Sequence, residues 1–255
     1  MKKKYLIITG GSGFIGAELV KFFLDKEYFI FVIDKKELKV ASKFKKNFKF
    51  FKCDITNEKQ LLSINKKILK FTKSIDAVIN NAGFTTNSNL KSKNNFFNIF
   101  EETNFLVWDQ VMSTNVRSVA IVCKVFGQLM KNKYGGSIVN IASDVGVISP
   151  NYDIYKNSNF NLPISYAVSK AAVIHLSKCL AVYWAKNKIR VNSISPAGIY
   201  NNHKKEFVDK LSNLIPMKRM MKISEITGAV EYLISKKSTF VTGQNIILDG
   251  GRTSW

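Results

Sequence analysis

Short apolar stretches alternate along this chain with amphipathic segments, and this alternation constrains the fold more than any other feature. Strand-like apolar runs lie at 5–9, 29–34, 48–54, 76–83, 136–143, 189–196 and 245–251. Helical patterns lie between them at 15–26, 57–71, 107–130, 166–186 and 224–235. Strands that are apolar on both faces are typical of parallel sheets covered by helices on both sides. The pattern therefore predicts an α/β fold with a doubly wound parallel sheet of about seven strands.

The length of 255 residues suits one such domain, because no linker, low-complexity segment or internal repeat interrupts the alternation. No apolar run reaches the roughly 18 residues that cross a membrane. The basic N-terminus precedes an apolar run that is short and breaks at glycines, unlike a signal peptide. We therefore expect a single domain over residues 1–255, located in the cytoplasm and without a membrane partner.

The cysteines and histidines do not form the clusters that metal sites require. Cys53, Cys123 and Cys179 are widely separated in apolar settings, which favours reduced core cysteines. His175 and His203 have no metal-ligating neighbour in the sequence. We therefore expect no metal site.

The formal net charge of +21 raises the question of a nucleic-acid partner. The segment 43–52 even interleaves phenylalanines with lysines. However, the lysines are spread over the whole chain and alternate with apolar positions, which is typical of solvated outer faces. Attraction of an anionic small substrate is a simpler role for the positive electrostatic potential of these residues. We expect a small-molecule substrate and no nucleic acid.

A glycine-rich loop, TGGSGFIG at 9–16, follows the first strand and opens the first helix. Glycines permit a tight turn and close approach to a phosphate, while the helix N-terminus offers free N–H groups and the positive end of its dipole. The strand before and the helix after provide the context of a dinucleotide site. The expected contacts are Gly10, Ser12, Gly13, Phe14, Ile15 and Gly16.

Carboxylates end the second and third strands. Asp34 could accept both hydroxyls of an adenosine ribose and would repel a 2′-phosphate, which favours NAD over NADP. Lys35 and Lys36 stand beside it and could hold that phosphate, so NADP stays open. Asp54 could reach the adenine amino group, with Ile55 next to it, or could simply cap a turn.

Eight stretches, in order, resemble the short-chain dehydrogenase/reductase family. They are TGGSGFIG, CDIT, NNAG (80–83), Asn115 in STNVRSVA, IVNIASDVG (138–146), YAVSK (166–170), RVNSISPAG (190–198) and TGQNIILDGG (242–251). The resemblance spans nearly the whole chain. It implies a Rossmann fold, an NAD(P)-dependent interconversion of an alcohol and a ketone, and a homodimer or homotetramer.

The resemblance also implies site residues. The catalytic set would be Asn115, Ser143, Tyr166 and Lys170. The last two would also contact the cofactor, Asn81, Ala82 and Gly83 would back its adenosine side, and Pro196, Gly198 and Ile199 would border the nicotinamide.

Tyr166 and Lys170 stand four residues apart, so they share one face of a helix. A nearby ammonium favours phenolate and is expected to lower the tyrosine pKa from about 10, and oxidised nicotinamide adds a second positive charge. A phenol shifted in this way can exchange a proton with a substrate alcohol near neutral pH. Ser143 would bind the substrate oxygen, and Asn115 would position a water linking Lys170 to solvent.

Three features depart from the family pattern. The loop reads T-G-x-x-G-x-x-G, with Phe14 where most members of this length have glycine. The stretches at about 84–107 and 149–163 are longer than usual. Both follow C-terminal ends of strands, where ligands bind in open α/β sheets. They could shape the substrate pocket or an oligomer contact, or they could be lengthened surface loops.

These departures resemble a subgroup of bacterial enzymes for flagellin modification and legionaminic-type sugar synthesis, which suggests a polar, anionic or nucleotide-linked sugar. The expected substrate loop, at about 200–222, contains several basic residues that either meet an anion or are solvated: His203, Lys204, Lys205, Lys218 and Arg219. One alternative is a 3-oxoacyl-thioester reductase of lipid metabolism. Another is a non-catalytic protein that senses the cofactor or binds nucleic acid.

Overall fold

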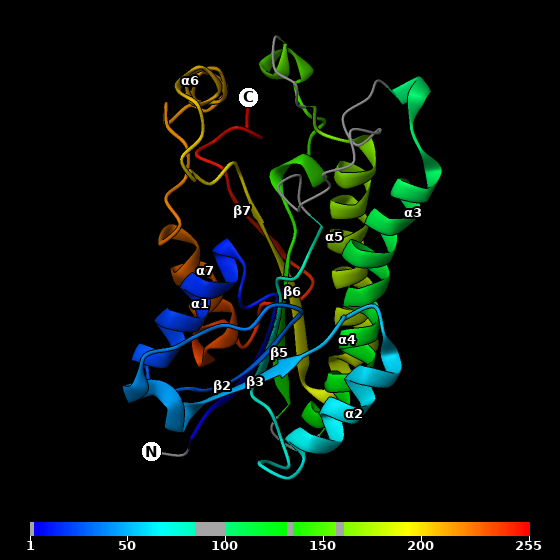
Figure 1. Cartoon of the computed structure of the whole chain (residues 1–255), viewed down its shortest axis with the longest axis vertical. Helices are drawn as coiled ribbons and strands as arrows, with labels where there is room; N and C mark the ends of the chain where they lie inside the picture. Colours follow the sequence, from blue (N-terminus) through cyan, green and yellow to red (C-terminus); the bar gives the residue numbers. More distant parts are fainter. Residues whose placement is uncertain (1–2, 85–99, 132–134, 157–160) are drawn as a thin grey trace.

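One parallel sheet of seven strands organises the protein (Figure 1). The computed structural model describes residues 3–84, 100–131, 135–156 and 161–255. The strand order is β3-β2-β1-β4-β5-β6-β7, and every described ladder is parallel. The strands are β1 (Tyr5–Thr9), β2 (Phe29–Asp34), β3 (Phe48–Lys52), β4 (Ala77–Asn80), β5 (Gly136–Ile141), β6 (Ile189–Pro196) and β7 (Asn245–Leu248). The predicted α/β class is confirmed.

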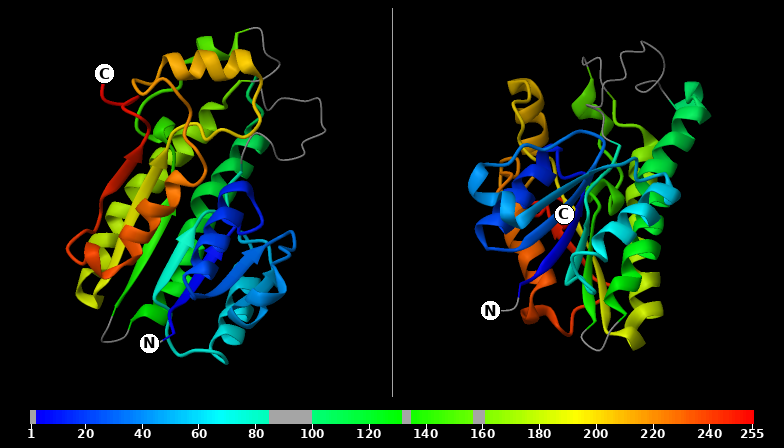
Figure 2. Two further views of the ribbon diagram at one scale, coloured as in Figure 1. Left: turned by 90° about the vertical axis from the view of Figure 1, so that its left-hand side faces the viewer. Right: turned by 60° about the horizontal axis from the view of Figure 1, so that its bottom comes forward.

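Helices cover both faces of this sheet. One side holds α1 (Phe14–Asp25) and α7 (Glu225–Ile234), and the other holds α2 (Glu58–Ile68), α4 (Ser118–Gly127) and α5 (Ile164–Trp184) (Figure 1). The helix α3 (Phe105–Met112) leads toward α4. The helix α6 (Lys205–Asn213) lies beyond the end of the sheet where the strands finish (Figure 2).

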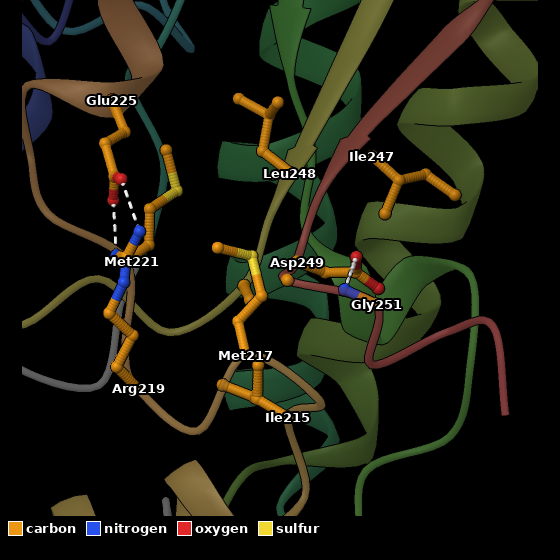
Figure 3. Close-up of a pocket in the computed structure, with 11 residues that line it drawn as sticks. Ile215, Met217, Arg219, Met221, Glu225, Ile247, Leu248, Asp249 and Gly251 are labelled. Atoms are coloured by element: carbon orange, nitrogen blue, oxygen red, sulfur yellow. Dashed lines mark hydrogen bonds and ion pairs between the residues drawn. The ribbon is translucent and has the colours of Figure 1, made fainter.

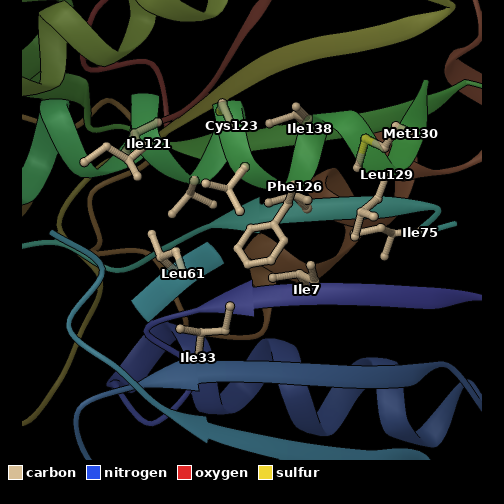
Figure 4. Packing of buried hydrophobic residues seen from close by; sticks show 14 of the residues in the cluster. Ile7, Ile33, Leu61, Ile75, Ile121, Cys123, Phe126, Leu129, Met130 and Ile138 are labelled. Carbon is tan, nitrogen blue, oxygen red and sulfur yellow. The ribbon is translucent and has the colours of Figure 1, made fainter. Parts of the chain in front are cut away.

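The double covering explains why most strands carry apolar side chains on both faces. Successive side chains of a strand point to opposite faces. Ile7 packs on the α2, α4 and α5 side, whereas Leu6 and Ile8 pack on the α1 and α7 side, and all three are fully buried. Phe126 of α4 packs in the same cluster as Ile7 (Figure 4).

The strand order reverses direction between β1 and β4. From β1 the chain moves outward to β2 and β3, and from β4 it moves the other way to β7. Thr9 and Asn80, the last residues of β1 and β4, are neighbours in the ladder. Connections after these two strands diverge to opposite sides, and ligands bind in the crevice that results.

Several element boundaries differ from the sequence-based expectation. The helix predicted over 107–130 is interrupted by a π-helical turn at Ser113–Arg117. The helix α6 forms inside the expected substrate loop, and the third strand stops at Lys52. Cys53 and Cys123 are buried, but Cys179 is exposed on α5, so its predicted core position is wrong.

Most of the stretch at 84–107, and residues 157–160 of the stretch at 149–163, lie outside the described residues. None of the helices in the described ranges has the length and apolar content needed to cross a membrane.

Core packing gives a stability test. Phe126 is fully buried, so Phe126→Ala removes apolar contacts and leaves a cavity. We expect it to lower the free energy of unfolding by about 3–5 kcal/mol in urea denaturation. Phe240→Ala is the matched control, because that ring is fully exposed and its loss should change stability by less than about 0.5 kcal/mol. Equal losses in the two variants would contradict the packing described for α4.

Candidate active site

A groove of about 610 Å³ opens at the carboxyl ends of the strands around the β1–β4 switch point. Most residues predicted to hold a cofactor line it: Gly10, Ser12, Gly13, Phe14, Ile15, Asp34, Asp54, Ile55, Asn81, Ala82, Gly83 and Ile199. The structure therefore brings most of the predicted cofactor contacts together in one groove.

The glycine loop is shaped by close backbone approaches. Gly10 has a φ of +65°, and a Cβ added there would lie 2.6 Å from the Cα atom of Ala82. A Cβ on Gly16 would overlap the carbonyl oxygen of Gly10. Gly16 does not line the groove, so in the protein alone its role is to bring α1 against the loop. Asn81 supports the loop by donating to the Gly10 carbonyl at 2.9 Å.

The Asp34 carboxylate is held at the mouth of the groove by backbone donors. One of its oxygens accepts from the Ser12 N–H and the other from the Lys36 N–H, each at 3.0 Å. Each carboxylate oxygen has a second lone pair available, so the group can still accept from ligand hydroxyls. Asp34 is thus oriented by the glycine loop on one side and by the chain after β2 on the other.

The Asp54 carboxylate is held by more contacts than the Asp34 carboxylate. One oxygen accepts from the backbone N–H and the hydroxyl of Thr56 at 2.9 and 2.7 Å, and the other pairs with the Lys35 ammonium at 2.8 Å. Burial opposes its charged form, but the hydrogen bonds from Lys35 and Thr56 prevail and lower the pKa of Asp54. The Lys35 ammonium is therefore engaged by Asp54, and both residues line the groove.

The four predicted catalytic residues come from three segments that meet beside this groove. Tyr166 and Lys170 lie on α5, and the Lys170 nitrogen is 5.5 Å from the centre of the Tyr166 ring. Lys170 donates to the Ile141 carbonyl at 3.0 Å. Ser143 lies two residues after the end of β5 and forms a hydrogen bond with Tyr166. The Asn115 amide donates to Ser169 at 3.0 Å, which links the π-helical turn to α5.

The π-helical turn explains how Asn115 reaches this position. In a π-helix the backbone hydrogen bonds join residues i and i+5, which widens the helix locally. Such turns often occur at functional sites. Asn115 is buried, and its side-chain oxygen accepts from the Phe84 N–H at 2.6 Å. The side chain therefore connects α5 to the segment that follows β4.

Burial dominates the proton affinities of the reactive pair. It raises the pKa of Tyr166 to about 12, although the hydrogen bond from Ser143 acts in the opposite direction. It lowers the pKa of Lys170 to about 8. The expectation that Lys170 lowers the pKa of Tyr166 below its ordinary value is therefore wrong for the protein alone, since desolvation is the larger effect.

Gly83 lies where the groove meets the four residues. A Cβ on it would lie 3.4 Å from the side-chain oxygen of Asn115 and 3.6 Å from the Lys170 nitrogen. Tyr166, Lys170, Pro196 and Gly198 are not among the groove-lining residues. Gly198 packs instead against α6, where a Cβ would lie 2.5 Å from Leu211.

The basic residues of the expected substrate loop are largely engaged within the protein. Lys205 pairs with Asp209 at 2.5 Å, and Arg219 forms two contacts with Glu225 at 2.7 and 2.8 Å (Figure 3). Burial lowers the pKa of His203, which lines the groove. A neutral imidazole at pH 7 gives little attraction for an anion. These contacts do not support an anion site built from Lys205, Arg219 or His203.

The other two basic residues of the expected substrate loop are Lys204 and Lys218. Lys204 directly precedes α6, and Lys218 donates to the Asn213 carbonyl at 3.2 Å. The ammonium of Lys218 also lies 5.4 Å from the centre of the Trp255 ring.

Several groove residues were not predicted from the sequence. Gln110 and Thr114 line the groove from α3 and the π-helical turn, and Phe84 and Asn201 line it from loops. Gln110 and Thr114 are four apart, so helical spacing would have placed both on one face with Asn115 as a neighbour. No comparable signal exists for the loop residues.

Comparison with known proteins places this arrangement in a family. The family model described as enoyl-(acyl carrier protein) reductase matches residues 15–253. A short-chain dehydrogenase from Leptospira borgpetersenii with bound NAD⁺ has 34% identity, covers 99% of this chain and 94% of its own, and superposes with a TM-score of 0.88. The chain belongs to the short-chain dehydrogenase/reductase family, whose members are oxidoreductases acting on alcohols and ketones.

Two relatives indicate the range of this family. The post-translational flagellin modification protein A of Campylobacter coli is 27% identical over 259 residues, which covers 98% of each chain. A probable NADP-dependent mannitol dehydrogenase of Yarrowia lipolytica is 32% identical over 267 residues, covering 98% of this chain and 88% of the relative.

The buried ammonium gives a pH-dependent stability prediction. Between about 8 and 10.5, Lys170 binds a proton in the unfolded chain but not in the folded one, so rising pH favours folding there. Relative to Lys170→Met, the wild-type protein should gain about 1–3 kcal/mol of unfolding free energy across that window. Urea denaturation of both proteins at neutral and alkaline pH measures the gain. A constant difference would show that Lys170 titrates normally.

Proposed function

We propose that the protein interconverts a secondary alcohol and a ketone on a polar, sugar-type substrate, with NAD as the preferred cofactor. The observation that supports this most is the convergence of Asn115, Ser143, Tyr166 and Lys170 beside the groove at the switch point. These residues are drawn from the π-helical turn, the end of β5 and α5. Their meeting provides an acid/base, an oxygen ligand and a cation at one place.

Tyr166 would act as the acid/base. In alcohol oxidation its phenolate accepts the hydroxyl proton of the substrate, and in reduction its phenol returns a proton to the carbonyl oxygen. Lys170 stabilises the phenolate through its charge and Ser143 through a hydrogen bond. Ser143 would also bind the substrate oxygen as charge develops on it. Asn115 would position a water that relays protons between Lys170 and solvent.

The groove residues suit a nicotinamide dinucleotide. The glycine loop and the start of α1 would hold the diphosphate, and Asp34 the adenosine ribose. Gly83 leaves open the passage from the groove to Lys170, which would bind the nicotinamide ribose. When bound, the cofactor supplies direct hydride transfer with the substrate carbon.

The substrate class rests on both the site and the relatives. The mannitol dehydrogenase among the relatives is named for a sugar alcohol, which is a polar, hydroxyl-rich compound. A 3-oxoacyl-thioester reductase is the second candidate, because a 3-oxoacyl-[acyl-carrier-protein] reductase of Chlamydia muridarum is 32% identical to this chain. Turnover of acyl thioesters with NADPH, without turnover of sugars or sugar alcohols with NAD, would favour that candidate.

A cytoplasmic homo-oligomer is part of the proposal. Large apolar side chains are exposed on two neighbouring helices, namely Phe105 and Leu106 of α3 and Val182 and Tyr183 of α5. These surfaces could pair across a twofold axis. The protein would form a single domain. Its loop at 200–222, which contains α6, would close over the substrate.

The catalytic role of Tyr166 has a direct test. Tyr166→Phe removes the hydroxyl that exchanges the proton, so hydride transfer should fall by at least about 1000-fold. Fluorescence titration with NADH should still show binding, since the glycine loop and Asp34 remain. The control is Tyr183→Phe on the exposed part of α5, with unchanged turnover expected. Normal turnover in Tyr166→Phe would refute the assignment.

Cofactor preference tests the role of Asp34. We expect NADH to bind about tenfold or more tighter than NADPH, because the Asp34 carboxylate repels a 2′-phosphate. Asp34→Ser should remove most of this difference in fluorescence titrations. Asp25→Ser, at the far end of α1, provides a control that changes the same charge outside the groove. Equal affinity of the wild-type protein for both cofactors would argue against NAD preference.

A non-catalytic role in nucleic-acid binding makes a different prediction. A gel-shift assay with duplex DNA at physiological salt should show no saturable binding if the basic residues only solvate the surface. Tight, saturable binding together with absent dehydrogenase activity would favour that class.

A further inference from the structure

A buried ion pair connects the C-terminal tail with the residue after Ser143. The Arg252 guanidinium lies 2.6 Å from the Asp144 carboxylate, and the two side chains are only 7% and 4% exposed. The residues are 108 positions apart in the chain. Removing two charges from water is costly, so such a pair is weak evidence for a role in stability alone.

A turn in the C-terminal tail, residues 249–255, places Arg252 next to Asp144. The Asp249 side chain accepts from the backbone N–H of Gly251 at 2.9 Å (Figure 3) and from that of Thr253 at 2.6 Å. Gly250 and Gly251 have φ values of +63° and +91°, which form a tight turn after β7. The added-Cβ position of Gly250 lies 2.7 Å from Ile215, so the turn packs closely on the chain after α6.

The two oxygens of the Asp144 carboxylate bind different partners, one in the candidate active site and one in the C-terminal tail. One oxygen accepts from the Ser143 hydroxyl at 3.0 Å and from the Val145 N–H at 2.8 Å, and the other contacts Arg252. A serine hydroxyl has one proton to donate. Asp144 therefore competes for the one proton with which Ser143 can donate to the Tyr166 oxygen and lower the pKa of Tyr166.

The charges around Tyr166 come from several elements. Asp144 and Tyr155 both act to raise the pKa of Tyr166. Arg252 bears an opposite charge and pairs directly with Asp144. Lys170 approaches from α5, and Tyr152 lies near enough to Tyr155 to affect it. Asp144 is thus the charged group through which the tail can influence Tyr166.

We propose that Arg252 and Asp144 are a positioning pair that orients the Ser143 hydroxyl and balances the charge felt by Tyr166. This inference rests on the proposed acid/base role of Tyr166. Arg252 weakens the hold of Asp144 on the Ser143 proton, so that Ser143 can release it toward the substrate oxygen. The C-terminal tail thereby becomes part of the machinery for proton exchange without touching the substrate.

Titration of Tyr166 in the presence of NAD⁺ tests the pair without a known substrate. The ultraviolet absorbance of tyrosinate is followed against pH in each protein, and the curve of the same protein carrying Tyr166→Phe is subtracted. Arg252→Met leaves the Asp144 charge uncompensated, so the midpoint should move up by about one pH unit. Asp144→Asn leaves the Arg252 charge alone, so it should move down. Arg252→Lys keeps the charge and should restore the wild-type midpoint.

The double variant Asp144→Asn with Arg252→Met separates charge from folding, because it leaves no unpaired buried charge. Its midpoint should lie between those of wild type and Asp144→Asn. If a single variant does not fold, the double variant and Arg252→Lys decide the question by the same midpoints. Variants that lose thermal stability but all keep the wild-type midpoint would overturn the inference and leave a packing role.

A different experimental result would refute the proposed function. Retained turnover in Tyr166→Phe would refute the acid/base role whatever the midpoints show. A dead Tyr166→Phe with unshifted midpoints in the Arg252 and Asp144 variants would refute only the positioning pair.

Discussion

The covering of the sheet on both faces is the constraint on which the rest of the structure depends. The strands from β1 to β6 place one row of apolar side chains under α1 and α7 and the next row under α2, α4 and α5. The faces of the sheet are therefore mainly apolar, and the groove opens at the ends of the strands. The reversal of strand order between β1 and β4 then selects one end for the groove.

The same burial governs the chemistry of the reactive pair. An amine and a phenol on consecutive turns of α5 are both driven toward their neutral forms, to pKa values of about 8 and 12. Their charged forms therefore depend on groups brought close to them.

The sequence predicted those parts of the site that depend on local pattern. The glycine loop, the carboxylates that end β2 and β3, and the four-residue spacing of Tyr166 and Lys170 are all readable over short stretches. The structure placed most of the predicted residues in one groove. What could not be read was the balance of burial against charge at Tyr166, because burial depends on elements that are distant in the chain.

The π-helical turn and the tail contact escaped prediction for the same reason. Apolar spacing over 107–130 is compatible with one continuous helix, and only contacts of Asn115 with Ser169 and Phe84 show why the helix widens there. Likewise, nothing near Asp144 in the sequence indicates Arg252.

Long-range contacts of this kind carry information that motifs do not. A motif fixes which groups react, and its residues recur wherever the chemistry does. The surroundings fix how strongly those groups hold their protons. In this protein a buried carboxylate next to Ser143 would disfavour the phenolate of Tyr166 unless a cation compensated it. The fold supplies that cation from the end of the chain, through a turn held by Asp249 and packed beneath the segment that follows α6. The same turn therefore links the segment that follows α6, through Arg252 and Asp144, to Ser143.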